Sequence, residues 1–223
     1  MQKFSISSRW IIAATLLLAT AVIAGVYLTL TMNEYGRREV RMESRTMLSV
    51  VSMHLETDIK TINGAIVALA GSPWVRPALM VPSAINREHA NSVLDRYNQA
   101  IGASVSYLID GRGVVIASSN RKQADSFMGQ FYGFRPYFTE AIKGKPHSYF
   151  AYGVTSRKKG YYTSAPVRSP AGAVLGVVVM KKDLDELENF MAQFEKCFLI
   201  DPRGIVFLSS RPEFSLKSVW PLT

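Results

Sequence analysis

The first pattern along the chain is an apolar run near its start. Residues 10–31 include no Asp, Glu, Lys or Arg. A helix of this length extends about 33 Å, which is enough to cross the hydrocarbon core of a bilayer. Trp10 and Tyr27 lie near its two ends, where aromatic side chains favour the membrane interface. The run therefore predicts a transmembrane anchor at 10–31, preceded by a cytoplasmic segment at 1–9.

A cleaved signal peptide is the alternative, because Ala19-Thr20-Ala21 resembles a small-residue cleavage site. The apolar run continues to Leu30, well past that site, and this favours an uncleaved anchor. The flanking charges do not decide the orientation, because four arginines follow the run whereas only Lys3 and Arg9 precede it. Those four are Arg37, Arg38, Arg41 and Arg45.

A stripe of apolar residues predicts one long helix after the anchor, in the segment 32–72. Residues 33–70 contain no proline, and apolar residues recur at every third or fourth position. The stripe consists of Leu48, Val51, Leu55, Ile59, Ile62, Ile66 and Leu69. Gly71-Ser72-Pro73 is expected to end the helix. Such a stripe fits a helix that covers its own domain core, and equally one that pairs with the same helix of a second copy in a homodimer.

Residues 73–188 show a mixed pattern that predicts an α+β domain. After a proline-punctuated connection, Asn86 is expected to cap a helix that runs to Ile101, with Gly102 as its stop. Five strands are then expected, with a hairpin turn at 110–113 between the first two. The strands are predicted at 105–109, 114–118, 148–153, 160–167 and 174–181. A short helix at 183–193 leads out of this antiparallel sheet.

One hairpin sequence occurs twice. Leu108–Gly113 returns as Leu199–Gly204, at an offset of 91 residues, and the flanking Val115 and Ser118 return at the same offset. Two copies with matching flanks predict two related units in tandem, although two unrelated hairpins are the alternative. The second unit is then expected to begin within 189–223 and to be incomplete, so we expect the chain to be a piece of a longer protein or a truncated product.

The charge balance is basic but does not indicate nucleic-acid binding. Lys and Arg total 26 against 17 Asp and Glu, a formal charge of +9. A basic balance suits nucleic acid, anionic lipid or a small anion. The densest basic run is only Arg157-Lys158-Lys159, so we expect no nucleic-acid partner. The single cysteine, Cys197, allows no internal disulfide and is expected to be a small buried residue at the start of a strand.

The candidate chemistry begins in the aromatic stretch Phe131–Phe138. It places Arg135 among five aromatic residues, next to Gly133 and Pro136. Packing can hold such a guanidinium so that its planar donors face a carboxylate or phosphate. The alternative is that the aromatic residues are core and that Arg135 pairs with an internal acid. The stretch alone leaves both interpretations open.

Four motifs follow one another in the second half of the chain. They are Leu-Ile-Asp-x-Arg-Gly at 108–113, Phe-Arg-Pro-Tyr-Phe at 134–138, Gly-Tyr-Tyr-x-Ser-x-Pro-Val at 160–167 and Val-Leu-Gly-Val-Val-Val-x-Lys-x-Asp-Leu at 174–184. Together they resemble the periplasmic sensor of C4-dicarboxylate sensor histidine kinases of the DctB type. The resemblance extends from about Asn33 to the end of the chain and is most specific within Asp110–Glu188.

The resemblance implies a fold, a ligand and a setting. The fold is a tandem PAS-like, or double Cache, sensor with a five-stranded antiparallel sheet in its membrane-distal domain at 73–188. That domain would bind succinate, fumarate or malate in the periplasm, as part of a two-component kinase held in the bacterial inner membrane. The ligand contacts carried over from the family are Tyr132, Arg135, Thr155, Ser156, Tyr161, Tyr162, Ser164 and Lys181. The basic run at 157–159 departs from the family pattern.

The chemistry of a dicarboxylate agrees with this set. Two carboxylates need cationic donors for charge and hydroxyl donors for geometry, and charge-assisted hydrogen bonds are the strong ones. We expect Arg135 to face one carboxylate and Lys181 the same or the other one. Phe134, Pro136, Tyr137 and Phe138 are expected to hold Arg135 in place. Lys182 is the better candidate for a solvated lysine, and Tyr149 and Tyr152 are expected to be core residues.

The sequence shows no pattern typical of an enzyme. The three histidines are isolated, and neither a nucleophile motif nor a phosphate-binding glycine loop is present, so we expect no catalysis within this chain and no cofactor. Three hypotheses remain: a sensor for C4-dicarboxylates, a sensor of the same fold with another ligand or output, such as a chemoreceptor or a cyclic-dinucleotide enzyme, and an anchored interaction protein with an empty pocket.

Overall fold

The computed structural model describes residues 5–220, with side chains from Trp10 onward. The predicted cytoplasmic segment 1–9 therefore lies outside the described side chains, and residues 221–223 lie outside the description altogether. The chain divides into two compact units at Val50 and Val51. We call the part up to Val50 the helical unit and the part from Val51 the α/β unit, and each is described by itself.

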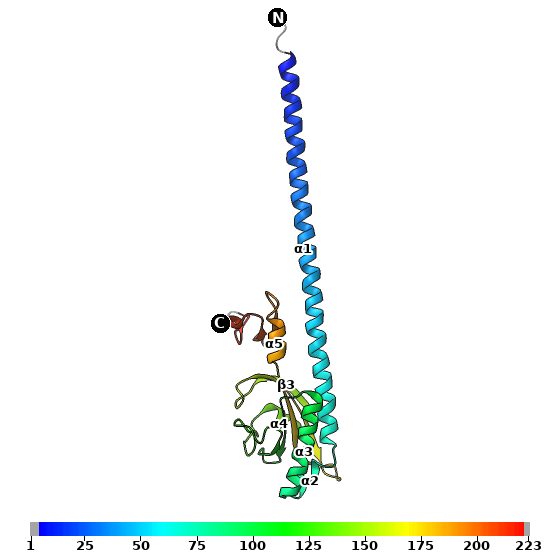
Figure 1. The fold of residues 1–223 in the computed structure, drawn as a ribbon, viewed down its shortest axis with the longest axis vertical. Coiled ribbons are helices and arrows are strands. Elements are labelled where there is room, and N and C mark those ends of the chain that lie inside the picture. The colour runs from blue at the N-terminus through cyan, green and yellow to red at the C-terminus, as the bar shows by residue number, and fades with distance from the viewer. Residues whose placement is uncertain (1–4, 221–223) are drawn as a thin grey trace. The chain divides into compact units, whose positions relative to one another are not determined.

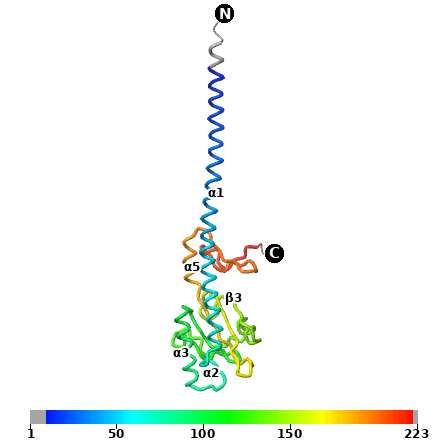
Figure 2. Tube along the Cα trace, turned by 90° about the vertical axis from the view of Figure 1, so that its right-hand side faces the viewer, coloured from blue at the N-terminus to red at the C-terminus, as the bar shows by residue number. Residues whose placement is uncertain are grey.

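The helical unit consists of the first part of α1, a single helix over Ser5–Ala70 (Figure 2). The predicted anchor and the predicted long helix are thus one continuous element. Of the described helices, α1 alone has the length and composition to cross a membrane, within Trp10–Ala70. Four threonines in its apolar part, Thr15, Thr20, Thr29 and Thr31, donate their hydroxyls to carbonyls one turn earlier. These bonds satisfy the threonine hydroxyls of a segment that otherwise suits lipid.

The α/β unit is built around a five-stranded antiparallel sheet in the order β2-β1-β5-β4-β3 (Figure 1). The strands are β1 Val105–Asp110, β2 Val115–Ser118, β3 His147–Tyr152, β4 Lys159–Arg168 and β5 Val174–Asp183. The helices are the last turns of α1 together with α2 Arg76–Met80, α3 Ala84–Ile101, α4 Pro136–Ala141 and α5 Asp185–Met191. After them come β6 Phe198–Ile200, β7 Val206–Ser209 and a 3-10 turn at Pro212–Phe214. The predicted α+β class and all five predicted strands are confirmed.

Strand alternation gives the sheet two different faces. On one face lie α3 and the last turns of α1, whose buried residues include Ile62, Ile66 and Leu94 (Figure 1). On the other face, Tyr107 of β1 and Val179 of β5 join a cluster with the residues of α4 and of the connection before it. We call the second face the α4 face. Because neighbouring residues of a strand point to opposite faces, each strand residue is assigned to one of them.

Three details of the helices differ from the sequence prediction. Helix α3 begins at Ala84, because Ser83 accepts the capping hydrogen bond from the Asn86 backbone; Asn86 is not the cap. The short helices α2 and α4 were not predicted, since each begins beside a proline inside a stretch that looks irregular. Gly102 does end α3, with a φ of +63° in the left-handed region.

The repeated hairpin has the same geometry in both copies. β1–β2 and β6–β7 are paired in registers that match at the offset of 91 residues, including one irregularity at the same place. In each turn the aspartate, Asp110 or Asp201, accepts backbone hydrogen bonds at 2.9–3.0 Å from the residues two and four positions later. The turn glycines, Gly113 and Gly204, have φ of +91° and +82°. This agreement supports related units over two unrelated hairpins.

Candidate functional site

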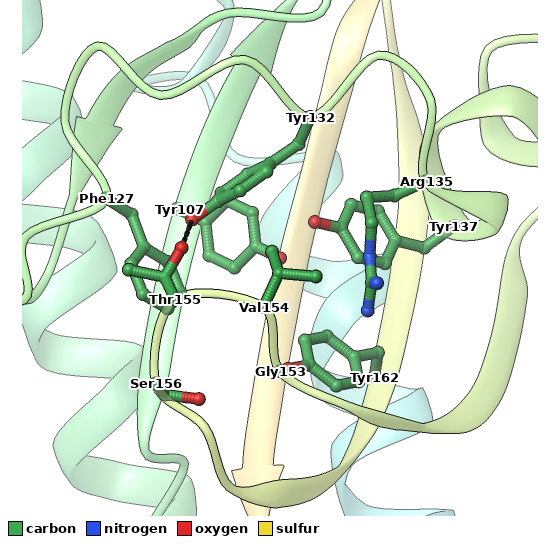
Figure 3. Close-up of a pocket in the computed structure, with 10 residues that line it drawn as sticks. All are labelled: Tyr107, Phe127, Tyr132, Arg135, Tyr137, Gly153, Val154, Thr155, Ser156 and Tyr162. Carbon is green, nitrogen blue, oxygen red and sulfur yellow. Dashed lines mark hydrogen bonds between the residues drawn. The ribbon is translucent and has the colours of Figure 1, made fainter.

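A pocket opens on the α4 face of the sheet (Figure 3). It encloses about 210 Å³ that protein atoms leave free, part of which is open to solvent. Its walls come from β1, the aromatic stretch, the loop after β3 and the start of β4. The lining residues are Tyr107, Phe127, Tyr132, Arg135, Tyr137, Gly153, Val154, Thr155, Ser156 and Tyr162. Five of the eight sequence-predicted contacts are thus brought together here.

Arg135 lies at the N-terminus of α4, where the proline that follows it restricts its backbone conformation. It is the N-cap residue, with φ −77° and ψ 139°, the extended conformation that a residue before proline adopts. Its guanidinium carbon lies 5.6 Å from the ring centroids of Tyr137 and Tyr162 and 5.9 Å from that of Tyr149. Three aromatic rings therefore hold the cation by packing and cation–π attraction.

Arg135 has no counter-charge among the residues that the structure describes. Among residues 10–220, no carboxylate lies within ion-pair distance of its guanidinium, which is only partly buried. The alternative that this arginine pairs with an internal acid is therefore not realised in the described structure. A packed, charged fork of donors at a pocket remains available for an anion.

Hydroxyl groups surround the space in front of Arg135. The Tyr132 hydroxyl and Thr155 Oγ1 form a hydrogen bond of 2.7 Å across the pocket. The Tyr107 hydroxyl is buried and lies near enough to that of Tyr137 for each to act on the other's pKa, but no well-formed hydrogen bond satisfies it among the described residues. A buried polar group without a partner is costly, so this hydroxyl is a candidate to bind a ligand or a water molecule. Sequence reasoning missed Tyr107, although the alternation of β1 assigns it to the same face as Val105 and Ile109.

Burial keeps the pocket tyrosines protonated. Desolvation raises the pKa of Tyr107 well above its ordinary value, with neighbouring tyrosines adding to the effect. Desolvation also raises the pKa of Tyr137 and of Tyr162, while the positive charge of Arg135 acts in the opposite direction on both. These phenols are therefore neutral at physiological pH and can donate hydrogen bonds to an anion.

The loop after β3 brings two of the hydroxyls into the pocket. Gly153 and Lys158 close it with a backbone hydrogen bond of 2.8 Å. A side chain at Gly153 would overlap the Ser156 and Tyr162 hydroxyls, which explains the glycine. Two of the three basic residues that depart from the family pattern have acidic partners: Lys158 pairs with Asp185 at 2.5 Å and Lys159 with Glu188 at 2.6 Å. The unusual charge of the loop thus anchors it to α5.

Lys181 lies beside the pocket and not in its wall. Its side chain is 1% exposed, and Nζ donates to Ser156 Oγ at 2.7 Å. Nζ also forms an ion pair with Asp183, two residues further along β5. The neighbouring Lys182 extends from the opposite face and pairs with Asp58 of α1 at 3.4 Å. At 21% exposed against 1% for Lys181, it is the more solvated of the two lysines, as expected.

Two predicted contacts lie elsewhere. Tyr161 points away from the α4 face, to the side of the sheet that α3 covers. There its hydroxyl forms hydrogen bonds with Asn63 of α1 at 3.0–3.1 Å. Tyr161 and Tyr162 are adjacent strand residues and cannot both face the pocket, so assigning both was an error. Ser164 is on the pocket side but donates to backbone carbonyls of Tyr137 and His147, so its hydroxyl is occupied.

The supporting aromatic residues also differ from the prediction. Phe134 was expected to hold Arg135 in place, yet it is 59% exposed, and Pro136 is exposed as well. Tyr137 and Phe138 are buried as expected, and Tyr137 additionally lines the pocket. Tyr149 packs against Arg135, whereas Tyr152 is 47% exposed and is not a core residue.

Nothing in the described site suggests a metal. Among the residues that the structure describes, no group of three His, Cys, Asp or Glu side chains is placed to hold a metal ion. Cys197 is buried, as expected, and burial raises the pKa of its thiol. The arrangement of one guanidinium without a described carboxylate partner, several neutral hydroxyls and a nearby buried ammonium suits recognition of a small organic anion.

Comparison with known proteins gives matches over most of the chain, although no protein-family model matches. Two curated proteins named C4-dicarboxylate transport sensor protein DctB are similar. The one from Pseudomonas aeruginosa is 32% identical over 191 residues, covering 85% of this chain and 31% of that protein. The one from Rhizobium meliloti is 31% identical over 218 residues, covering 96% and 34%. The chain therefore spans about a third of the length of these relatives.

A solved structure gives a fuller match. The crystal structure of the sensor domain of the histidine kinase DctB from V. cholerae aligns with a TM-score of 0.75 and 33% sequence identity. The alignment covers 81% of this chain and 70% of that one.

Proposed function

This chain belongs to the DctB family of sensor domains, and from that premise we propose that its pocket binds a C4-dicarboxylate such as succinate, fumarate or malate. The observation that carries the proposal is Arg135, whose guanidinium is packed by three aromatic rings and has no carboxylate partner among the described residues. An anion is the partner that such a group lacks.

The pocket suits two carboxylates at its two ends. One carboxylate accepts from Arg135 in bidentate geometry. The other accepts from Thr155 and Ser156, on the side where Lys181 reaches Ser156 from behind. Neutral tyrosine hydroxyls, including the unpartnered one of Tyr107, supply further donors between them.

The setting of this binding follows from the rest of the chain. We place α1 across the bacterial inner membrane as a single span and the α/β unit in the periplasm, with α1 pairing with its copy in a homodimer. The parent protein would be a two-component sensor histidine kinase whose catalytic domains lie outside these residues, and the hairpin β6–β7 would begin a second PAS-like unit. A ligand signals in such a protein only by binding two receptor states unequally.

Isothermal titration calorimetry of the full chain in lipid nanodiscs tests the proposal. We expect succinate to bind, and butyrate, which has the same carbon count but one carboxylate, to bind at least about tenfold more weakly because it loses charge-assisted hydrogen bonds. Binding of an amino acid or another acid in place of succinate would identify a sensor of the same fold with a different ligand. No binding of any of these ligands by a folded chain would favour an interaction protein.

A further inference from the structure

The buried lysine beside the pocket already has a carboxylate partner from its own strand. Lys181 and Asp183 are two residues apart in β5, so both extend from the α4 face of the sheet. The Lys181 side chain is 1% exposed and that of Asp183 is 22% exposed. A buried ammonium requires a counter-charge, and the ion pair with Asp183 supplies it.

This ion pair lies directly behind the pocket wall. Lys181 Nζ donates to Ser156 Oγ at 2.7 Å, and Ser156 lines the pocket. Nζ also lies 5.9 Å from the ring centroid of Tyr162, another lining residue. An ammonium has three donors, of which Ser156 accepts one, and the ion pair with Asp183 balances its charge. A ligand carboxylate at this end of the pocket would meet Lys181 beside Ser156.

The two cations of the site are therefore in different electrostatic states. Arg135 has no carboxylate partner among the described residues, whereas Asp183 neutralises Lys181. A dianionic ligand thus meets two positive charges and one negative charge of the protein. Lys158 offsets this negative charge only in part, because its Nζ lies 3.9 Å from Asp183 and closer, 2.5 Å, to Asp185.

We propose that Asp183 is a positioning residue that sets the affinity for the ligand's second carboxylate. It holds Lys181 in place when the pocket is empty, and its charge opposes a carboxylate that approaches the same ammonium. Like charges a few ångströms apart near a protein surface repel appreciably. The inference rests on the proposed dicarboxylate function and adds that the binding is weakened by an acid built into the site.

The test is Asp183→Asn in the full chain in lipid nanodiscs, titrated with succinate and with butyrate. The amide keeps the shape of the side chain and an oxygen that accepts from Lys181, but it removes the charge. We expect about tenfold tighter binding of succinate, because one repulsive charge interaction is lost. We expect no change for butyrate bound through Arg135, since it has no second carboxylate near Asp183.

The matched control is Asp185→Asn, which removes the same charge two residues later. Asp185 pairs with Lys158 at the start of α5 and forms no hydrogen bond or ion pair with Lys181 in the described structure. Its succinate affinity should stay within about twofold of wild type, because an exposed pair contributes little. An equal gain in both variants would indicate a general charge effect and would overturn the inference.

The outcomes separate this inference from the proposed function. If the wild type binds succinate and Asp183→Asn binds it no more tightly, the inference alone is overturned. The same holds if Asp183→Asn increases the affinity for succinate and for butyrate equally. No succinate binding by either protein overturns the proposed function together with the inference. If thermal denaturation shows Asp183→Asn to be unfolded, Asp183→Ser, which removes the same charge and retains an acceptor oxygen, decides by the same criteria.

Discussion

Replacing Arg135 by alanine is expected to weaken succinate binding by about 100-fold or more while leaving the fold intact. The bidentate guanidinium would lose two charge-assisted hydrogen bonds, each worth about 1.5–3 kcal/mol. The fold should tolerate the change, because the side chain is partly exposed and no described carboxylate depends on it. Its contacts with the three tyrosine rings contribute about 1 kcal/mol each at most at such a site. Calorimetry measures the affinity, and circular dichroism checks the fold.

Two variants sharpen this result. Arg135→Lys keeps the charge but loses the planar fork, so we expect an affinity between those of wild type and Arg135→Ala. Arg112→Ala removes the same charge from the exposed turn of the first hairpin, where the side chain is 84% exposed, and should leave the affinity unchanged. If Arg135→Ala binds succinate within about threefold of wild type, the arginine supports the domain structurally and the proposed function loses its main observation.

Replacing Gly176 by alanine is expected to destabilise the α/β unit by about 3 kcal/mol or more. Gly176 lies in β5, the central strand of the sheet, opposite Asp110 of β1. An added methyl group would overlap the Ile109 backbone oxygen and approach Leu79 to 2.9 Å. Because the overlap is with backbone, the two strands must separate, and forced overpacking of this kind costs about 1–3 kcal/mol or more. Thermal denaturation should show a clearly lower midpoint.

Gly64→Ala is the matched control for this substitution. Gly64 is exposed in α1, and nothing lies within 4 Å of the position that its Cβ would occupy. Alanine there should stabilise the helix by about 0.5–1 kcal/mol, because glycine loses more backbone entropy on folding. Equal midpoints for Gly176→Ala and wild type would show that β1 and β5 are not packed as closely as described.

Local patterns in the sequence were sufficient for most of the sheet. Alternating apolar residues and glycine turns predicted the five strands to within about two residues, and the repeated hairpin proved to be the same structure twice. The helices α2 and α4 were missed because five or six residues cannot show a helical period. The capping of α3 by Ser83 was misjudged because a serine and an asparagine three residues apart are both good caps.

The sequence predicted some of the site residues and missed or misassigned others, and the residue pattern around each one explains why. Arg135 stood out because an arginine among aromatic residues is unusual, and the loop hydroxyls of Thr155 and Ser156 followed from the family resemblance. Tyr161 was included although strand alternation should have excluded it once Tyr162 was assigned. Tyr107 was overlooked because a tyrosine in a strand looks like an ordinary core residue until its hydroxyl is found without a partner.

The ion pairs could not be predicted from the sequence. Lys158, Lys159 and Lys181 looked alike as basic residues near strand ends, yet two of them bind α5 and the third is buried beside the pocket. The partners of the first two, Asp185 and Glu188, lie 27 and 29 residues further on, and only the folded sheet brings them close. Long-range pairing of this kind has no local signature.

A crystal structure of the full chain with succinate is the most direct test of the central claim, which is that Arg135 binds one carboxylate of a dicarboxylate. We expect one carboxylate in bidentate contact with the Arg135 guanidinium at about 2.7–2.9 Å. We expect the other against Thr155 and Ser156, on the side of Lys181. Succinate bound outside this pocket, or bound in it with both carboxylates away from Arg135, would contradict the claim.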